Sequence, residues 1–216
     1  MADFLFPKLH KEGYRFLAIS LVITFVLLLI SNFLGLISSA ITIWVYYFFR
    51  DPQRYAIKDE NFLVSPADGV ISQIAEVNGP KELGLENKKF TRVSIFMNVF
   101  NCHVNKVPSS GKINKIIYKS GKFFNASLDK SSDENERNYV QMTNSNKDEL
   151  VIVQIAGLIA RRIVCEVTEN SEVKQGDNFG IIRFGSRVDL YFENYKILVC
   201  QNQKTIGGET LIARKV

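Results

Sequence analysis

The sequence contains few of the residues that build metal centres and disulfide frameworks. Its 216 residues include three cysteines, Cys102, Cys165 and Cys200, and two histidines, His10 and His103. Two histidines are too few for a multi-histidine metal site, and no Asp/Asn ladder resembles a calcium loop. A sparse, odd set of cysteines without a Cys-x-x-Cys motif is typical of a reducing compartment. No metal cofactor is therefore expected.

Charge is absent from residues 16–49, although the whole chain has a net charge of +5 and a mean hydropathy of +0.01. The stretch divides into two apolar runs, 16–30 and 33–49, on either side of Ser31-Asn32. As helices these runs would be roughly 22 and 26 Å long, against a bilayer core of about 30 Å. One continuous helix would overshoot the bilayer. The expected structure is a helical hairpin over residues 1–50.

Basic residues flank this hairpin on both sides, with Lys8, Lys11 and Arg15 before it and Arg50 and Arg54 after it. The positive-inside tendency places both ends in the cytoplasm. The hairpin either dips into one leaflet or crosses both, and a buried hairpin of a soluble protein is the alternative. The stretch is too long for a cleavable signal peptide, and a polytopic transporter would need more apolar spans.

The sequence pI near 9.0 fits either an anionic membrane surface or nucleic acid. The lysines and arginines are scattered and accompany no nucleic-acid recognition motif, so we expect a membrane partner and no nucleic acid. Trp44, Tyr46 and Tyr47 near the end of the hairpin suit an interfacial aromatic belt.

Residues 51–216 have the composition of short β-strands. Asp51-Pro52 ends the apolar region, because proline moves the preceding residue out of helical geometry. Strands rich in Val, Ile, Phe and Tyr are expected at 69–77, 91–96, 112–118, 150–155, 159–168, 179–184 and 188–192. The polar stretch 125–138 is expected to be a loop or a short helix. The predicted fold class is α+β, mainly β, with a compact barrel-like β catalytic domain behind the N-terminal hairpin.

Two turns, at 64–71 and 173–180, resemble those of hybrid-barrel domains such as lipoyl carriers. Glycine supplies positive φ in such turns, and Asp or Asn caps the backbone. Lipoyl attachment needs a lysine at a hairpin tip, whereas the only Asp-Lys pair, Asp129-Lys130, lies in the polar stretch. A membrane-anchored adaptor or carrier domain without catalysis is therefore kept as the alternative function.

Gly185-Ser186 stands between two strand-like runs, where Gly-Ser by itself indicates only a turn. A hydrolase nucleophile elbow is excluded, because the positions two residues either side of Ser186 hold Phe184 and Val188 instead of glycine. The segment 184–192 resembles the self-cleavage site of the short-form, pyruvoyl-dependent phosphatidylserine decarboxylases. Further stretches that match this family, in the same order over nearly the whole chain, are 65–69, 102–108, 121–130, 135–138, 154–163 and 208–210.

The resemblance implies a proenzyme that makes its own cofactor. Ser186 attacks the Gly185 carbonyl, the resulting ester eliminates, and the dehydroalanine left on the new N-terminus hydrolyses to a pyruvoyl group. The products are a large chain, 1–185, and a small chain, 186–216. The substrate amine then forms a Schiff base with the pyruvoyl carbonyl, which accepts the electron pair left by carbon dioxide. Phosphatidylserine becomes phosphatidylethanolamine, a step of phospholipid biosynthesis at the inner membrane.

The same resemblance assigns catalytic roles to His103 and Asp68. His103 would be the base and Asp68 the carboxylate that fixes the tautomer of its ring. The alternatives are a core histidine and a plain turn cap. Longer family members carry a second histidine where this chain has Lys106, which leaves the role of Lys106 open. Cations that could hold the lipid phosphate are Lys122, Lys130, Arg137, Arg161 and Arg162. Acyl preference, lipid backbone and a homodimer are also left open.

Overall fold

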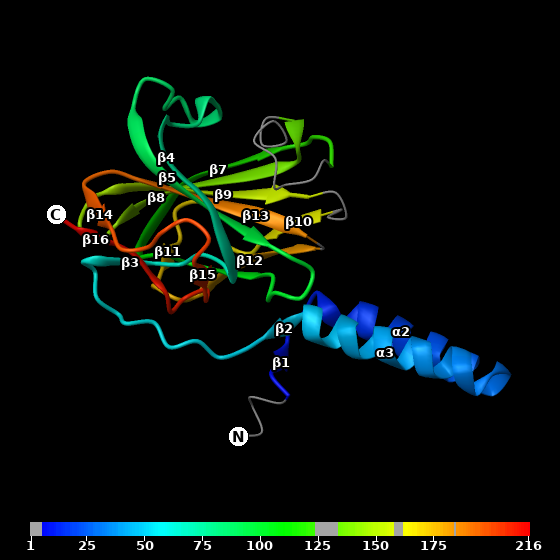
Figure 1. Cartoon of the computed structure of the whole chain (residues 1–216). Coiled ribbons are helices and arrows are strands. Elements are labelled where there is room, and N and C mark those ends of the chain that lie inside the picture. The colour runs from blue at the N-terminus through cyan, green and yellow to red at the C-terminus, as the bar shows by residue number, and fades with distance from the viewer. Residues whose placement is uncertain (1–5, 124–133, 158–161, 184) are drawn as a thin grey trace.

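The computed structural model describes residues 6–123, 134–157, 162–183 and 185–216. Two helices, α2 (Gly13–Ile30) and α3 (Asn32–Phe48), form a hairpin that projects from a body of strands (Figure 1). The fold is α+β and mainly β, as predicted. The described strands are β1 (Lys8–Leu9), β2 (Arg50–Asp51), β3 (Phe62–Val64), β4 (Gly69–Asn78), β5 (Lys89–Met97), β6 (Val104–Lys106), β7 (Gly111–Lys119), β8 (Arg137–Asn144), β9 (Glu149–Ala156), β10 (Arg162–Cys165), β11 (Glu172–Val173), β12 (Asn178–Arg183), β13 (Ser186–Phe192), β14 (Tyr195–Ile197), β15 (Lys204–Thr205) and β16 (Leu211–Lys215), with a 3-10 turn, η1, at Lys81–Leu83.

The hairpin helices are apolar on nearly every face and bind each other through small and hydroxyl side chains. The 18 residues of α2 have a mean hydropathy of 2.3, and only 11% of them are buried. Between the helices, Thr24 shares hydrogen bonds with Ser38 at 2.7 Å and Thr42 at 2.9 Å. Gly35 lies so close to Leu28 that a Cβ would meet its side chain at 2.2 Å. By length and composition α2 is able to cross a membrane.

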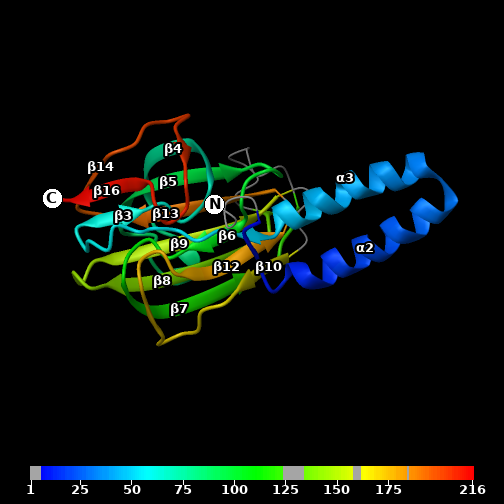
Figure 2. The same cartoon turned by 90° about the horizontal axis from the view of Figure 1, so that it is seen from below.

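The main sheet has eight strands in the order β11-β7-β8-β9-β13-β5-β4-β15 and curls into a half-barrel (Figure 2). Its neighbouring strands are antiparallel, and β13 lies between β9 and β5. Alternate side chains of these strands form the buried core, including Val93, Ile95, Ile152, Val188 and Leu190. The start of β13 is therefore held by hydrogen-bonded strands on both sides.

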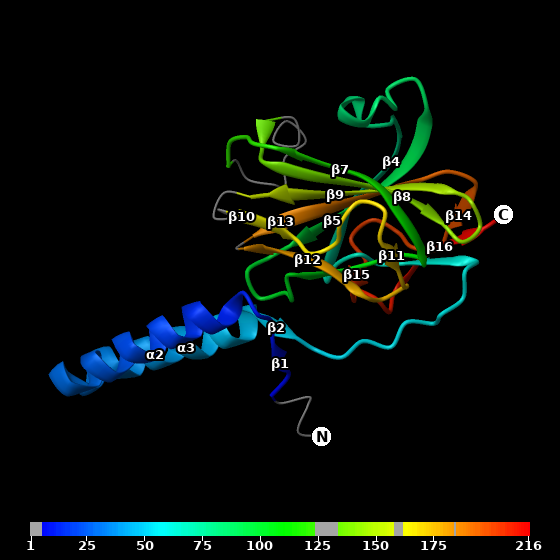
Figure 3. The same cartoon turned by 180° about the vertical axis from the view of Figure 1, so that it is seen from behind.

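A second sheet, β10-β12-β6, lies next to the hairpin (Figure 3). Phe48 and Phe49, at the end of α3, pack in one buried cluster with Cys102, Val104 and Ile181. Ion pairs add to this contact: His10 bonds Glu166 at 3.1 Å, and Glu12 pairs with Arg183 of β12. We call this contact region, formed by the start of α2 and the end of α3, the hairpin root.

The predicted strands correspond to β4, β5, β7, β9, β10, β12 and β13, with residues 159–161 and 184 outside the described part. A loop or short helix was predicted for 125–138, but Arg137 and Asn138 belong to strand β8, so the prediction was wrong for these two residues. Residues 125–133 are not among those that the structure describes. Polar residues of β8 find partners on neighbouring strands. Asn138 donates to Gln154 at 2.9 Å, and Asn144 donates to the Tyr195 hydroxyl at 2.8 Å. These pairings cannot be seen in the local composition.

Candidate active site

Gly185 and Ser186 lie where the central strand of the main sheet begins. Ser186 is the first residue of β13 and pairs with Met97 of β5 on one side and Ala156 of β9 on the other. Gly185 has a φ of +65°, a left-handed conformation that other residues rarely adopt. A Cβ built at Gly185 would meet no described atom within 4 Å. Glycine is therefore favoured here by the left-handed backbone conformation, and a side chain at this position would not clash with the described atoms.

The hydroxyl group of Ser186 is buried without a hydrogen-bond partner. Ser186 is 0% exposed, and its Oγ bonds to no group in the described part of the chain. An unpaired buried polar group costs about 1–3 kcal/mol, so each case in a folded protein requires an explanation, and a catalytic role is one.

His103 lies beside the Gly185–Ser186 bond, just before β6. Its ring stacks on Phe48 of α3, with ring centroids 4.3 Å apart. Nδ1 donates to the main-chain carbonyl of Asn101 at 3.0 Å, because a carbonyl only accepts. Nε2 then accepts the Gly185 N–H at 3.3 Å. The structure thus places the His103 ring on the N–H of Gly185, the residue that precedes the predicted Ser186.

The imidazole of His103 is neutral at physiological pH. Complete burial lowers its pKa to about 4, and the positive charge of Arg50 acts in the same direction. The hydrogen bond to Asn101 opposes this shift without cancelling it. Nε2 is therefore the unprotonated ring nitrogen, and its lone pair accepts the Gly185 N–H.

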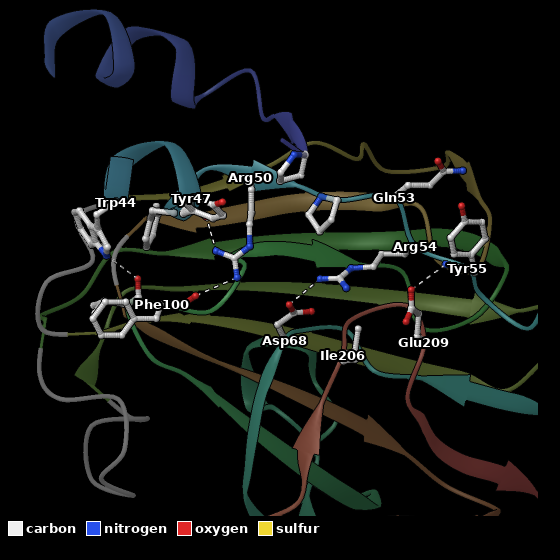
Figure 4. A pocket seen from close by; sticks show the side chains of 14 residues that line it. Trp44, Tyr47, Arg50, Gln53, Arg54, Tyr55, Asp68, Phe100, Ile206 and Glu209 are labelled. Carbon is white, nitrogen blue, oxygen red and sulfur yellow. Dashed lines mark hydrogen bonds and ion pairs between the residues drawn. The ribbon is translucent and has the colours of Figure 1, made fainter. Parts of the chain in front are cut away.

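Asp68 does not orient His103, and this part of the sequence prediction was wrong. Its Oδ2 forms an ion pair with Arg54 at 2.7 Å, and its Oδ1 accepts the Gly207 N–H at 2.7 Å. The role expected of Asp68 is filled by the carbonyl of Asn101, a main-chain group next to His103 in sequence. Asp68 and Arg54 both line the cavity drawn in Figure 4.

Lys106 is buried and paired, at the position where longer family members carry a second histidine. Its Nζ lies 3.1 Å from Asp51 Oδ1 and also donates to Asn178. Asn178 in turn donates to the other oxygen of Asp51 at 2.6 Å. Lys106 thus joins the segment after α3 to β12, and its ammonium group is held away from any role as a free base.

A cavity of about 810 Å³ opens at the hairpin root (Figure 4). Phe48 lines this cavity and also stacks on His103, which links the cavity to the Gly185–Ser186 site. The side chains of Arg50 and Arg54 enter the cavity from the segment after α3, and Asp68 enters from the start of β4. Exposed aromatic side chains, among them Phe100, which is 72% exposed, stand at its edge. The cavity therefore combines cationic and apolar walls.

Three of the cations predicted to hold a phosphate are described by the structure, and they do not line this cavity. Lys122 is exposed and pairs with Glu134 at 2.9 Å, and Arg137 is buried with its guanidinium on the Tyr139 hydroxyl at 2.7 Å. Arg162 lies exposed at the start of β10, and Lys130 and Arg161 fall outside the described residues. The cations of the cavity, Arg50 and Arg54, were noticed in the sequence only as flanking charge. The sequence feature that could have identified them is their position directly after the apolar stretch, where a lipid head group would lie.

The aromatic residues near the end of the hairpin face the protein more than predicted for a membrane belt. Trp44 donates its ring N–H to the carbonyl of Val99 at 3.2 Å. The Tyr46 hydroxyl donates to the carbonyl of Pro7 at 2.6 Å. Tyr47 remains 40% exposed at the edge of the cavity. These contacts fix the hairpin root against the strands.

Comparison with known proteins agrees with this geometry. The family description "phosphatidylserine decarboxylase" matches residues 41–213. The phosphatidylserine decarboxylase proenzyme of Pelagibacter ubique (strain HTCC1062) is 61% identical over 215 residues, covering 100% of both chains. Proteins of the same name from Rickettsia typhi and Rickettsia prowazekii are each 51% identical over 210 residues, 97% of this chain and 91% of theirs.

The protein is an enzyme, and its class is that of the decarboxylating lyases. More specifically, the chain belongs to the phosphatidylserine decarboxylase family. A non-catalytic carrier domain is therefore disfavoured, and Lys130, its only candidate attachment site, lies outside the described residues.

Proposed function

We propose that this chain is a membrane-bound proenzyme that cleaves itself between Gly185 and Ser186 and then decarboxylates phosphatidylserine to phosphatidylethanolamine. One observation carries the proposal. The buried, unpaired Ser186 hydroxyl follows a left-handed glycine, and a neutral imidazole nitrogen lies 3.3 Å from the same glycine's nitrogen. The chain thus holds the proposed nucleophile and the proposed base on either side of Gly185.

In the cleavage step, Ser186 Oγ attacks the carbonyl carbon of Gly185 while His103 Nε2 accepts the hydroxyl proton. The Gly185–Ser186 peptide becomes an ester as the proton passes to the departing nitrogen of Ser186. Glycine adopts the left-handed backbone at position 185 without steric cost, so the conformation that precedes Ser186 is available to the precursor. Elimination of the ester leaves residues 1–185 and 186–216 as separate chains.

The residues present fit a pyruvoyl group at position 186. Ser186 is 0% exposed, so a carbonyl formed there would be shielded from bulk water. Conversion to a pyruvoyl group removes the serine hydroxyl, and this would break no hydrogen bond to the described residues. When present, the pyruvoyl carbonyl supplies the electron sink that decarboxylation of an amino acid requires. His103 Nε2 would hold or deliver a proton beside it.

The cavity at the hairpin root is the proposed site for the lipid head group. The Arg54 side chain lines this cavity, where one of its terminal nitrogens bonds Asp68 Oδ2 at 2.7 Å. Arg50 lies on the same wall and donates to the carbonyl of Phe100 at 3.0 Å. Guanidinium groups bind phosphates through charge-assisted hydrogen bonds. The apolar edge of the cavity would then contact the acyl chains.

We further propose that the hairpin anchors the enzyme in the inner membrane with the strands on the cytoplasmic side. At 1.5 Å per residue, α2 and α3 are roughly 27 and 26 Å long, close to the thickness of a bilayer core. Their outward faces are apolar, and the flanking lysines and arginines favour the cytoplasm for both ends. The cavity then opens at the level of the lipid head groups.

The function is tested with purified protein and vesicles that contain phosphatidylserine. The expected result is release of carbon dioxide and formation of phosphatidylethanolamine, and prior treatment with borohydride, which reduces a carbonyl, abolishes both. Vesicles that contain an ether lipid with a serine head group report on the lipid backbone. Failure to release carbon dioxide from any serine lipid, or activity insensitive to borohydride, would contradict the proposal.

Replacing Arg54 tests the head-group site. For Arg54→Gln we expect kcat/KM for phosphatidylserine to fall by about 10- to 100-fold, mainly through KM, because a charge-assisted hydrogen bond contributes about 1.5–3 kcal/mol. Arg54→Lys should recover part of this loss. Lys122→Gln is the matched control, since its exposed ion pair with Glu134 contributes little. A KM raised by Lys122→Gln and unchanged by Arg54→Gln would reverse the assignment.

A further inference from the structure

We infer that the main-chain N–H of Gly157 is the oxyanion donor for the self-cleavage reaction; the inference rests on the proposed function. Gly157 N donates to the carbonyl oxygen of Gly185 at 3.0 Å. This carbonyl is the group that Ser186 attacks, and its oxygen carries the negative charge of the tetrahedral intermediate. This is the length of an ordinary N–H···O hydrogen bond, so the donor is already bonded to the oxygen on which charge develops.

The donor is fixed in direction by groups behind it. The peptide between Ala156 and Gly157 presents its carbonyl on one side, where Asn135 Nδ2 donates to it at 2.8 Å. A trans peptide points its N–H away from its carbonyl, so this bond directs the Gly157 N–H toward Gly185. Asn135 is 1% exposed, and Ala156 N donates to the carbonyl of Glu136 at 3.0 Å. Asn135 is therefore a positioning residue for the donor.

Both partners of the reaction meet at the end of the same pair of strands. Ser186 of β13 is in register with Ala156, the last residue of β9, so Gly157 lies opposite Gly185. Gly157 is buried directly after β9, and its N–H is bonded to the Gly185 carbonyl before charge develops. Preorganised donors of this kind stabilise a transition state more strongly than mobile water does.

The step balances without an added reagent. The Ser186 Oγ–H bond gives its proton to His103 Nε2, and Oγ bonds to the Gly185 carbonyl carbon. The π pair of that carbonyl moves to its oxygen, where the Gly157 N–H stabilises it. The pair returns as the bond from Gly185 C to Ser186 N breaks, and this nitrogen takes the proton from His103. The product ester is an isomer of the starting peptide.

The test compares Gly157→Pro with Gly157→Ala. Proline removes the N–H, and the extended backbone of Ala156 is compatible with a following proline. Alanine retains the N–H and controls for an added side chain. Full-length precursors are synthesised in a cell-free system with phosphatidylglycerol vesicles, and cleavage is followed on gels. We expect the proline variant to be cleaved at least about 100-fold more slowly than the alanine variant, the cost of one oxyanion donor.

Hydroxylamine assigns the effect to the first step. It cleaves esters, so in its presence the cleavage rate reports attack by Ser186 alone, and the same ratio between the variants is expected. A ratio that disappears with hydroxylamine would overturn the inference, because Gly157 would then act on elimination. If the proline variant fails to fold, judged by thermal unfolding, glycolate incorporated at position 157 removes the same N–H without a ring.

The outcomes separate the two proposals. Equal cleavage of the proline and alanine variants, or normal cleavage of the folded glycolate variant, overturns the role of Gly157 and leaves the proposed function standing. A wild-type precursor that never cleaves, with or without hydroxylamine, overturns the proposed function itself. A folded variant that lacks the N–H and cleaves at least about 100-fold more slowly in both conditions supports both.

Discussion

Ser186→Ala is expected to leave the protein as one intact chain with no decarboxylase activity. The substitution removes the proposed nucleophile and the oxygen that the elimination step expels, so no pyruvoyl group can form. The fold should be unaffected, because the Ser186 Oγ makes no hydrogen bond to the described residues. Alanine only replaces the hydroxymethyl group with a smaller, apolar methyl group. Deleting an unpaired buried hydroxyl removes a penalty of about 1–3 kcal/mol, so stability should not fall.

The measurement is a denaturing gel with intact mass, alongside carbon dioxide release. Enzymes accelerate reactions by about 10⁶-fold or more, so loss of the cofactor should reduce activity to background. Ser186→Cys is the matched variant, because a thiol can form the corresponding thioester, and slow cleavage is expected. Normal activity of an uncleaved Ser186→Ala chain would remove the basis of the cofactor assignment.

Replacing His103 has the second largest expected effect. His103→Phe keeps a planar ring that can stack on Phe48 but removes the Nε2 acceptor beside Gly185. General-base catalysis contributes about 10²- to 10⁴-fold, so precursor cleavage should slow by that range. The rate is measured from the decay of full-length precursor after cell-free synthesis, with unfolding temperature recorded in parallel.

Cys102→Ala is the control for this experiment. Cys102 adjoins His103, is equally buried, and contacts the carbonyl of Arg50 at 3.2 Å. Burial raises its pKa to about 11, so the thiol is protonated and is neither a nucleophile nor a base. Cleavage of Cys102→Ala should remain within a few-fold of wild type. Equal slowing by both substitutions would mean that packing around β6 matters and that His103 is not the base.

The hairpin and seven of the sixteen described strands were predictable because they depend on local pattern. The uncharged stretch 16–49 has too much apolar surface for any exposed loop, and Ser31-Asn32 is the one polar break between the helices. His103 could be singled out because it is the only imidazole outside the N-terminal flank. Gly185-Ser186 drew attention through a family resemblance, since a Gly-Ser pair alone predicts a turn.

The rest of the site depends on contacts that residue identity does not encode. The groups that hold His103 and Gly185 are the Asn101 carbonyl and the Gly157 N–H, and every residue carries such main-chain groups. Asp68 was predicted to orient His103, but in the folded chain its carboxylate binds the Arg54 guanidinium and the Gly207 N–H. The register of β13 with β9, which aligns these groups, is set by the assembled sheet.

The mass of the C-terminal fragment tests the central claim most directly. Purified protein is separated under denaturing conditions, and the small chain is measured intact and then fragmented. The account predicts a chain of residues 186–216 whose N-terminus is blocked and lighter than the serine form by the mass of ammonia, as a pyruvoyl group requires. A single 24.6 kDa chain, or a fragment that begins with an unmodified Ser186, would contradict it.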